Sequence, residues 1–278
     1  MHDVNSPGTS TCLFLPPYDR FTAIKDVTSC PQRGVAVIWR IADAKTQEVE
    51  RDWLQARPPC VSLIIMLPPP SAIRSALPLV REASTLRPRG VLPNSGVNSP
   101  EPVRLLLSSA PRDLPTLCTG HLAERKLLRN QVVRALVKRI FEMSATIPSI
   151  SKLCRKLYTS RRTVGRLFEA QGLPVPSHWL QLGRLMHVSA MIQEKQTMPI
   201  ARAAVHLSYP DGFTMSNQMK RLLGCRPSEV RECLGLAWIL EDWIYREKIS
   251  GRMCCDDEYS GYDNVDNWLR SGPMQRNT

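Results

Sequence analysis

The sequence predicts an α/β N-terminal domain, with a small and largely parallel sheet, followed by an all-α C-terminal domain. Three observations lead to this fold class. Short apolar runs alternate with helical stretches over residues 31–120, which is typical of strand–helix–strand units. Apolar residues recur at helical spacing from residue 121 onward. Between residues 146 and 235, a short helix, a break and a second helix occur twice.

The composition is that of a globular protein. The 278 residues suit one to two domains, and 43% of them are hydrophobic, which excludes wholesale disorder. No apolar run approaches the roughly 20 residues that cross a bilayer, and residues 1–5 lack the features of a secretory signal. Nine cysteines without C-x-x-C spacing fit a reducing compartment, and the adjacent Cys254 and Cys255 are interpreted as ordinary thiols. We therefore expect a cytoplasmic protein with no membrane segment, metal or other cofactor.

The N-terminal elements follow from short apolar runs. Residues 1–30, rich in Ser, Thr and Pro, are expected to form an irregular lead-in. Four runs are the candidate strands: residues 35–39, 61–67, 90–92 and 103–107. A helix is expected between the second and third runs, on the helical spacing of Ile73, Ala76, Leu77 and Val80.

This alternation distantly resembles phosphoacceptor receiver domains. Their chemistry requires an aspartate at the carboxyl end of a central strand, but here Leu67 is followed by Pro68. The resemblance therefore implies a sensory or dimerisation domain for residues 31–120, without phosphoryl transfer.

Residues 121–145 are predicted to form one connecting helix, regular from 122 to 143. Its apolar positions keep helical spacing: Leu128, Val132, Val133, Leu136, Val137 and Ile140. Basic residues occupy much of the other face: Arg125, Lys126, Arg129, Arg134, Lys138 and Arg139. This helix either bridges the two domains or opens the second one.

The stretch from Ser149 to Ala170 has the pattern of a helix-turn-helix. The first helix has one apolar face, made of Ile150, Leu153, Cys154 and Leu157, with Ser149 as its N-cap. Residues 158–160 are the break, and a second helix from Arg161 to Ala170 follows, with Ser160 as its N-cap. Its inward positions are Val164, Leu167 and Phe168, and its outward positions are Arg161, Arg162, Gly165 and Arg166. An arginine in the first turn of such a helix can reach a guanine edge or a phosphate.

The same arrangement recurs further along the chain. A short helix carries Ile200, Ala203, Ala204 and Leu207, and residues 208–211 are the break, with Asp211 as N-cap. The second helix, 212–223, buries Met215, Met219 and Leu222. Its outward side chains are the candidates for contact with DNA and include Phe213, Thr214, Ser216, Asn217, Lys220 and Arg221. Asparagine can read adenine, threonine offers a hydroxyl or methyl contact, and lysine and arginine can bind phosphates. A helix from about 177 to 194 joins the two units, and its 18 residues span about 27 Å, near the roughly 34 Å between successive major grooves.

Per residue, this helical segment is the most basic part of the chain. Residues 146–235 hold 13 basic and 5 acidic residues, a net charge of +8, out of +12 for the whole chain. Residues 236–278 hold 5 basic and 8 acidic residues. A basic surplus attracts polyanions through the long-range field and through counterion release. The charge alone does not distinguish this from a solvated surface that binds nothing specific.

From Ser149 to Arg231, the chain resembles the AraC-type DNA-binding domain, which has two helix-turn-helix units on a linker helix. The resemblance rests on Arg162-Thr163-Val164 and Arg166-Leu167-Phe168 in the first unit and most of all on residues 220–231, KRLLGCRPSEVR. It implies a tandem helix-turn-helix fold and a sequence-specific transcription regulator that binds double-stranded DNA. Base reading is implied for Arg161, Arg162, Gly165 and Arg166, and then for Gly212, Phe213, Thr214 and Asn217. RNA polymerase and a second copy of the chain are further candidate partners, and the effector is unknown.

The sequence departs from the family pattern in both turns. The family usually places glycine at the first turn residue, where a positive φ is needed, but Tyr158 and Ser208 stand there. Met215 and Met219 replace two usual phenylalanines. These departures keep open an alternative, a protein interaction module that no longer binds DNA specifically.

An enzyme is not expected, because the sequence contains no G-x-S-x-G, P-loop or H-E-x-x-H motif and no paired Cys/His ligand set. Residues 236–278 are predicted to form a further helix at 234–249 and then an acidic tail, interpreted as disordered.

Overall fold

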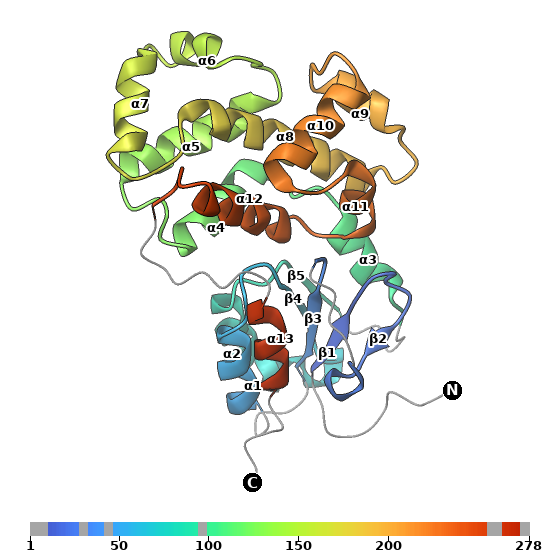
Figure 1. The fold of residues 1–278 in the computed structure, drawn as a ribbon. Coiled ribbons are helices and arrows are strands. Elements are labelled where there is room, and N and C mark those ends of the chain that lie inside the picture. Colours follow the sequence, from blue (N-terminus) through green and yellow to red (C-terminus); the bar gives the residue numbers. More distant parts are fainter. Residues whose placement is uncertain (1–10, 28–32, 42–46, 94–98, 255–262, 273–278) are drawn as a thin grey trace. The chain divides into compact units, whose positions relative to one another are not determined.

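A computed structural model describes residues 11–27, 33–41, 47–93, 99–254 and 263–272. The chain divides into two units (Figure 1). Unit 1 comprises residues 1–107 and 260–278, and unit 2 comprises residues 108–259. The second unit is therefore inserted in the sequence of the first.

Unit 1 contains a five-stranded sheet in the order β2-β1-β3-β4-β5. Strands β3 (Ala36–Arg40), β4 (Ser62–Met66) and β5 (Gly90–Leu92) run parallel, with Val37 beside Leu63 and Ile64 beside Gly90. These are three of the four predicted strands, and their side chains on β3 and β4 are almost wholly buried, as expected for a parallel sheet covered on both faces. The α/β prediction for this region is confirmed.

The sheet is mixed, because two strands come from the segment that was expected to be irregular. β1 (Thr11–Phe14) pairs antiparallel with both β2 (Phe21–Thr22) and β3. The four residues of β1 are all buried. So short a run gives no alternation to read, and its pairing with β3 is a long-range contact that local pattern does not reveal.

Residues 103–107, predicted as a strand, lie in helix α3 (Glu101–Ser108). Val103 and Leu107 are buried four residues apart, whereas Leu105 between them is 59% exposed. This is helical spacing, and the prediction was wrong because a short apolar run does not distinguish a strand from a helix.

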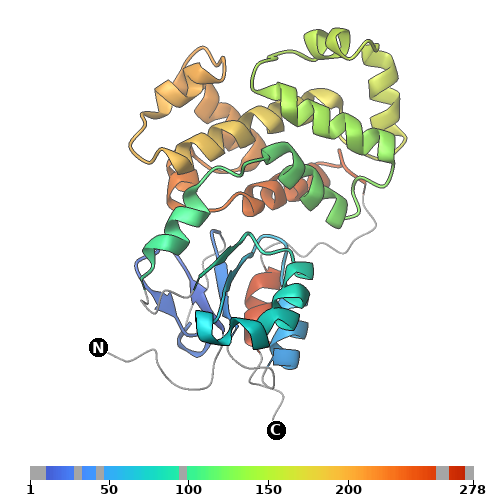
Figure 2. The ribbon, with the colours of Figure 1, turned by 180° about the vertical axis from the view of Figure 1, so that it is seen from behind.

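Helices α1 (Gln47–Gln55), α2 (Ile73–Thr85) and α13 (Asp263–Arg270) lie together beside the sheet (Figures 1 and 2). α2 is the helix predicted between the second and third apolar runs. The Trp268 ring of α13 stacks on the Trp53 ring of α1, with centroids 4.0 Å apart and planes 9° apart. Each indole Nε1 donates to the other residue's carbonyl oxygen, at 2.9 Å and 2.8 Å. The acidic tail is therefore helical over residues 263–270, contrary to the expectation of disorder, because Val265, Trp268 and Leu269 are buried in unit 1. Residues 255–262, with Cys255 and three of the tail's acidic residues, lie outside the described part of the chain.

In unit 2 the predicted connecting helix is two helices, α4 (Leu114–Glu124) and α5 (Gln131–Ser144). Lys126 has a φ of 54°, which ends α4, and the Asn130 side chain caps α5 by accepting from the backbone N–H groups of Val132 and Val133. Leu127 and Leu128 are buried in the link between them, so the apolar pattern continues through the break. This continuity explains why the sequence predicted one helix.

The remaining helices of unit 2 pack around α8 (Pro176–Glu194) (Figure 2). They are α6 (Ile150–Lys156), α7 (Arg161–Glu169), α9 (Ile200–His206), α10 (Gly212–Leu223), α11 (Pro227–Glu232) and α12 (Ala237–Ile249). Trp179 of α8 meets Phe168 of α7 and Trp243 of α12 edge-on, at 5.8 Å and 4.7 Å between centroids. The predicted helix at 234–249 is thus confirmed as α12, packed on the domain. Among the described helices, none combines the length and apolar character that spanning a bilayer requires.

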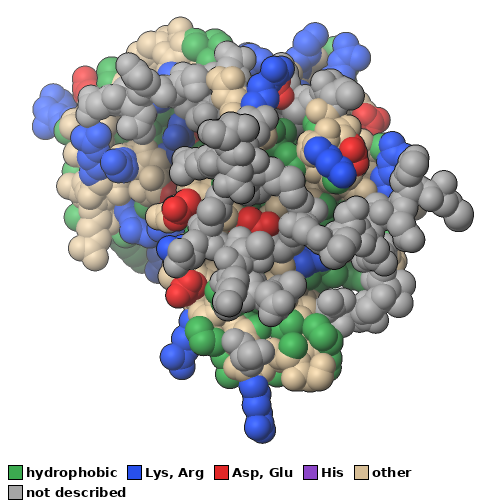
Figure 3. Space-filling model, turned by 90° about the horizontal axis from the view of Figure 1, so that it is seen from below, with side chains coloured by type: hydrophobic (Ala, Val, Ile, Leu, Met, Phe, Trp, Pro, Cys, Tyr) green, Lys and Arg blue, Asp and Glu red, His purple; other side chains and the backbone are tan. Residues whose placement is uncertain are grey.

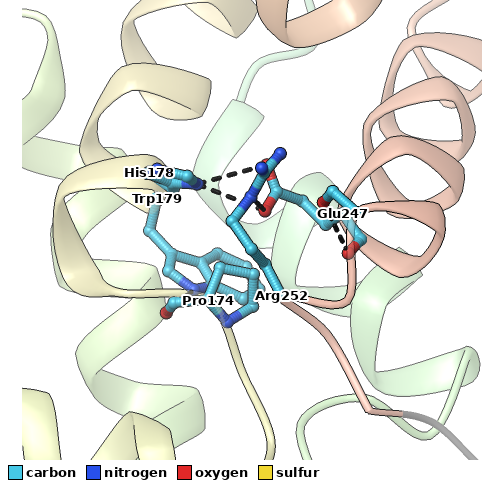
Figure 4. A network of polar contacts seen from close by, with 6 residues as sticks. Pro174, His178, Trp179, Glu247 and Arg252 are labelled. Carbon is cyan, nitrogen blue, oxygen red and sulfur yellow. Dashed lines mark hydrogen bonds and ion pairs between the residues drawn. The ribbon is translucent and has the colours of Figure 1, made fainter.

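A polar network joins α12 to the start of α8 (Figure 4). The Glu247 carboxylate is 1% exposed and lies 3.2 Å from His178 Nδ1 and 2.7 Å from Arg252 Nε. Burial raises the pKa of Glu247, but the hydrogen bonds and charges of His178 and Arg252 outweigh burial and hold it below the usual value. The network therefore stabilises a charged carboxylate in the interior.

Candidate DNA-binding interface

The first helix-turn-helix is built from α6 and α7 by local capping. The Ser149 hydroxyl accepts from the Lys152 N–H at 3.4 Å, and the Ser160 hydroxyl accepts from the Thr163 N–H at 3.0 Å. Both predicted N-caps are confirmed. Between the helices, Tyr158 has a φ of 51°, in the left-handed region. The sharp turn that this φ permits brings α7 across α6.

The second unit repeats the same turn 50 residues later. The Thr159 N–H donates to the Cys154 carbonyl, and the Tyr209 N–H donates to the Ala204 carbonyl, both at 3.0 Å. Ser208, the counterpart of Tyr158, has a φ of 58°. The backbone therefore keeps the positive φ that the family's glycine supplies, although a non-glycine side chain makes this conformation cost about 1–2 kcal/mol. Asp211 caps α10 as predicted, accepting from the Thr214 N–H at 2.6 Å.

Arg184 of α8 fixes the second turn from the side of the linker helix. Its Nη2 donates to the carbonyls of Leu207 and Ser208, at 2.8 Å and 3.0 Å, and its guanidinium lies 4.1 Å from the Tyr209 ring centroid. Burial raises the pKa of the Tyr209 phenol to about 12, and the Arg184 charge partly opposes this. The turn is thus tied to α8 by two hydrogen bonds and a cation–π contact.

Helix α7 presents a strongly basic outer face. The side chains of Arg161, Arg162 and Arg166 are exposed, whereas Val164 and Phe168 are buried against the domain. Gly165 lies between the arginines, and a Cβ built there meets nothing within 4 Å. All four predicted readers of the first unit are therefore on the outside of the domain, with open space around the helix backbone.

Helix α10 presents a largely uncharged face in its first two turns. Phe213 is 76% exposed, and Thr214 and Asn217 are also exposed, while Met215 and Met219 are buried. Lys220 and Arg221 are exposed in the last turn. The outer face of α10 therefore combines an aromatic ring and an amide with two cations further along the helix.

Three predicted residues of α10 are engaged within the protein. The Thr214 hydroxyl donates to Asp211 Oδ2 at 3.1 Å, and the half-buried Ser216 hydroxyl donates to the Gly212 carbonyl at 2.6 Å. A Cβ at Gly212 would come within 3.1 Å of the Ala201 backbone, so this glycine permits the close approach of α10 to α9. The sequence predicted that Gly212, Thr214 and Ser216 contact DNA, and this role stays a prediction.

Sequence reasoning did not single out three exposed cations of α6: Lys152, Arg155 and Lys156. Within the described residues, none of them forms an ion pair or a side-chain hydrogen bond, and neither do the three arginines of α7. The high density of lysine and arginine in residues 149–170 is the sequence signal that could have identified them. The described part of the chain holds no group of three His, Cys, Asp or Glu side chains arranged for a metal ion.

The units α6–α7 and α9–α10 lie near opposite ends of α8 (Figures 1 and 2). Two helix-turn-helix units, each with an exposed second helix, which is basic along α7 and carries two cations in the last turn of α10, define a DNA-binding domain. A family model described as a helix-turn-helix domain matches residues 153–232, from within α6 to the end of α11. This segment is a helix-turn-helix domain of the AraC type, so the chain carries the DNA-binding domain of a transcription regulator. Comparisons with curated proteins and with solved structures found no match.

Proposed function

We propose that the chain is a sequence-specific transcription regulator that places α7 and α10 in two successive major grooves along one side of the duplex. The observation that carries this proposal is the repeated turn, which gives α7 and α10 the same relation to the helix before each. Helix α8 has 19 residues and is therefore about 28 Å long, close to the roughly 34 Å that separate successive major-groove faces. One chain can then read two grooves without a partner copy.

The test is selection of duplexes from a random library with the purified full chain, followed by footprinting on the selected sequence. Two protected patches about 10 base pairs apart on one face are expected. With about six phosphate contacts, the affinity should fall about a thousandfold between 50 and 200 mM salt. A single patch, or protection on opposite faces of the duplex, would rule out tandem reading.

Arg162 of α7 and Asn217 of α10, one exposed residue from each helix proposed to enter a groove, give a sharper test. Replacing both with alanine should abolish the preference for the selected sequence while leaving the helical content unchanged, because both side chains are exposed. Arg74→Ala, an exposed arginine of α2 in unit 1, is the control for a lost charge. A double variant that footprints like the wild type would show that these residues are not the readers.

The second candidate function is a protein interaction module with a helix-turn-helix that no longer binds DNA specifically. The observation that favours it is that both turns lack the family's glycine and keep the strained φ with Tyr158 and Ser208. In this case the purified chain should select no sequence, and any weak binding to duplex DNA should show no preferred site at any salt concentration. The selection experiment therefore separates the two functions.

For unit 1 we propose a sensory or dimerisation role rather than a catalytic one. Leu77 of α2, Val91 of β5 and Leu105 of α3 are 54%, 46% and 59% exposed. On the face drawn in Figure 3, hydrophobic side chains gather at the lower edge, beside basic ones. Sedimentation of wild type and of Leu77→Gln with Leu105→Gln tests dimerisation. A wild type that stays monomeric at micromolar concentration would leave sensing as the role of unit 1.

A further inference from the structure

We infer that the two helix-turn-helix units divide the work of recognition: α6 and α7 hold the DNA backbone electrostatically, and α10 reads A·T base pairs with Phe213 and Asn217. This inference rests on the proposed function. It comes from comparing two units that share one backbone turn but present different side chains to the outside.

Outside its turn, where Tyr158 is 98% exposed, the first unit offers almost only cations. Six exposed basic side chains occur in 22 residues, 149–170, with Glu169 as the one acidic residue of that segment. Its neutral candidates contribute little, because Gly165 has no side chain and the Thr163 hydroxyl lies 2.8 Å from the Ser160 hydroxyl within the N-cap. Guanidinium and ammonium groups bind phosphates whatever the sequence, and they discriminate only for guanine.

The second unit differs at two of the three basic positions of α6, while the exposed Arg202 corresponds to Lys152. Val205 and His206 stand where α6 has Arg155 and Lys156, as the 50-residue repeat of the turn aligns them. In α10, Phe213 and Asn217 are four residues apart and exposed, so they share one face of the helix. Between them, the Thr214 hydroxyl donates its proton to Asp211, so the threonine offers a ligand its methyl group and acceptor lone pairs but no donor.

These two side chains match one kind of base pair. An apolar ring contacts the C5-methyl group of thymine, and an asparagine amide forms a bidentate pair with N6 and N7 of adenine. The Phe213 ring is 76% exposed, so it is accessible to a thymine methyl group. The DNA half-site that α10 contacts is therefore expected to contain a thymine and an adenine within one turn of the double helix.

The experiment uses the full chain and its selected duplex, with base analogues. Deoxyuridine in place of the contacted thymine removes one methyl group, and should weaken wild-type binding about fourfold. 7-Deazaadenine in place of the contacted adenine removes the N7 acceptor, and should weaken it about fivefold or more. Phe213→Ala should be insensitive to the first analogue and Asn217→Ala to the second, while each variant keeps its response to the other.

The electrostatic half of the inference is tested by the salt dependence of affinity. Arg155→Gln with Lys156→Gln should lower the slope of log affinity against log salt by about 1.8 and leave the selected sequence unchanged. Arg74→Gln with Arg81→Gln, exposed on α2, removes the same charge and should leave the slope almost unchanged.

Two kinds of failure are distinguishable. If the wild type selects no sequence, the proposed function itself fails. If it selects a sequence whose α10 half-site lacks A·T pairs, or if the analogues weaken the alanine variants as much as the wild type, the division of recognition is overturned while the proposed function stands. An unchanged salt slope in the Arg155/Lys156 variant would equally overturn it.

Discussion

Two glycines in unit 2 allow folding to be separated from DNA binding by the same substitution. Gly165 lies inside α7 and Gly120 inside α4, and both are half-exposed. A Cβ built at either position meets nothing within 4 Å. Alanine should therefore fit at both without any displacement of neighbours.

Both substitutions should stabilise the free protein. Glycine inside a helix is less favourable than alanine by about 1 kcal/mol, because its unfolded chain has more conformational freedom to lose. For a domain of roughly 150 residues, 1 kcal/mol raises Tm by about 2–4 °C. Gly183→Ala is the contrast within the same unit: its Cβ would lie 2.5 Å from Ser144 Oγ and 2.9 Å from Ser144 Cβ, so the overpacking of α5 against α8 should outweigh the gain and lower Tm.

Only Gly165→Ala should change DNA affinity. If the outer face of α7 lies against the duplex, the added methyl group overpacks that contact, which costs about 1–3 kcal/mol or roughly 5- to 150-fold in affinity. Gly120→Ala should bind the selected duplex like the wild type. Thermal unfolding by circular dichroism and fluorescence anisotropy on that duplex measure the two effects. If Gly165→Ala is stabilised yet binds with unchanged affinity, the face of α7 that contains Gly165 does not approach DNA closely.

Three further perturbations follow from the described contacts. Tyr158→Gly should relieve about 1–2 kcal/mol of left-handed backbone strain, and the greater freedom of its unfolded chain should offset about 0.4–1 kcal/mol of this gain, so the urea midpoint should rise. Tyr158→Ala keeps a Cβ and should not raise the midpoint. Equal midpoints for the two variants would show that the turn is not strained. Because the pKa of Glu247 is lowered on folding, its contribution is full above its unfolded pKa near 4.5 and is lost as the pH falls through the folded value. Glu247→Gln should accordingly show a flatter loss of stability below pH 4.5 in acid titrations of Tm, and parallel curves would refute this. Trp268→Ala should destabilise unit 1 by about 3–5 kcal/mol in urea unfolding, since it removes a buried stacked indole, and a loss under 1 kcal/mol would show that α13 is dispensable.

The helix-turn-helix units were predictable because their signals are local. Ser149, Ser160 and Asp211 cap helices through bonds to N–H groups three residues away, so the sequence alone locates the helix starts. The requirement for a positive φ at Tyr158 and Ser208 was also foreseen from the family pattern, and both residues meet it. Burial of Val164, Phe168 and Met215 then follows from helical periodicity.

The errors came from elements whose local pattern is ambiguous. Residues 103–107 are an apolar run with both strand and helix character, and burial of Val103 and Leu107 against their surroundings selects the helix. In the link between α4 and α5, the buried Leu127 and Leu128 conceal the break that Lys126 and Asn130 make. Periodicity reports which side chains are buried, and a buried link satisfies it as well as a helix does.

By itself the amino-acid sequence determined the fold class, the two capped helix pairs and the sign of their surface charge, since these depend on neighbours within a few residues. Only the tertiary structure decided that β1 pairs with β3, that Trp268 returns across more than 200 residues to stack on Trp53, and that the hydroxyls of Thr214 and Ser216 donate to Asp211 and Gly212 at the start of α10. The physical reason is that long-range pairing, and the atom that a hydroxyl bonds, depend on where distant parts of the chain come to lie. Because both hydroxyl protons are used inside the protein, the Asn217 amide is the exposed uncharged donor that α10 can offer to a base pair, with the Phe213 ring four residues before it.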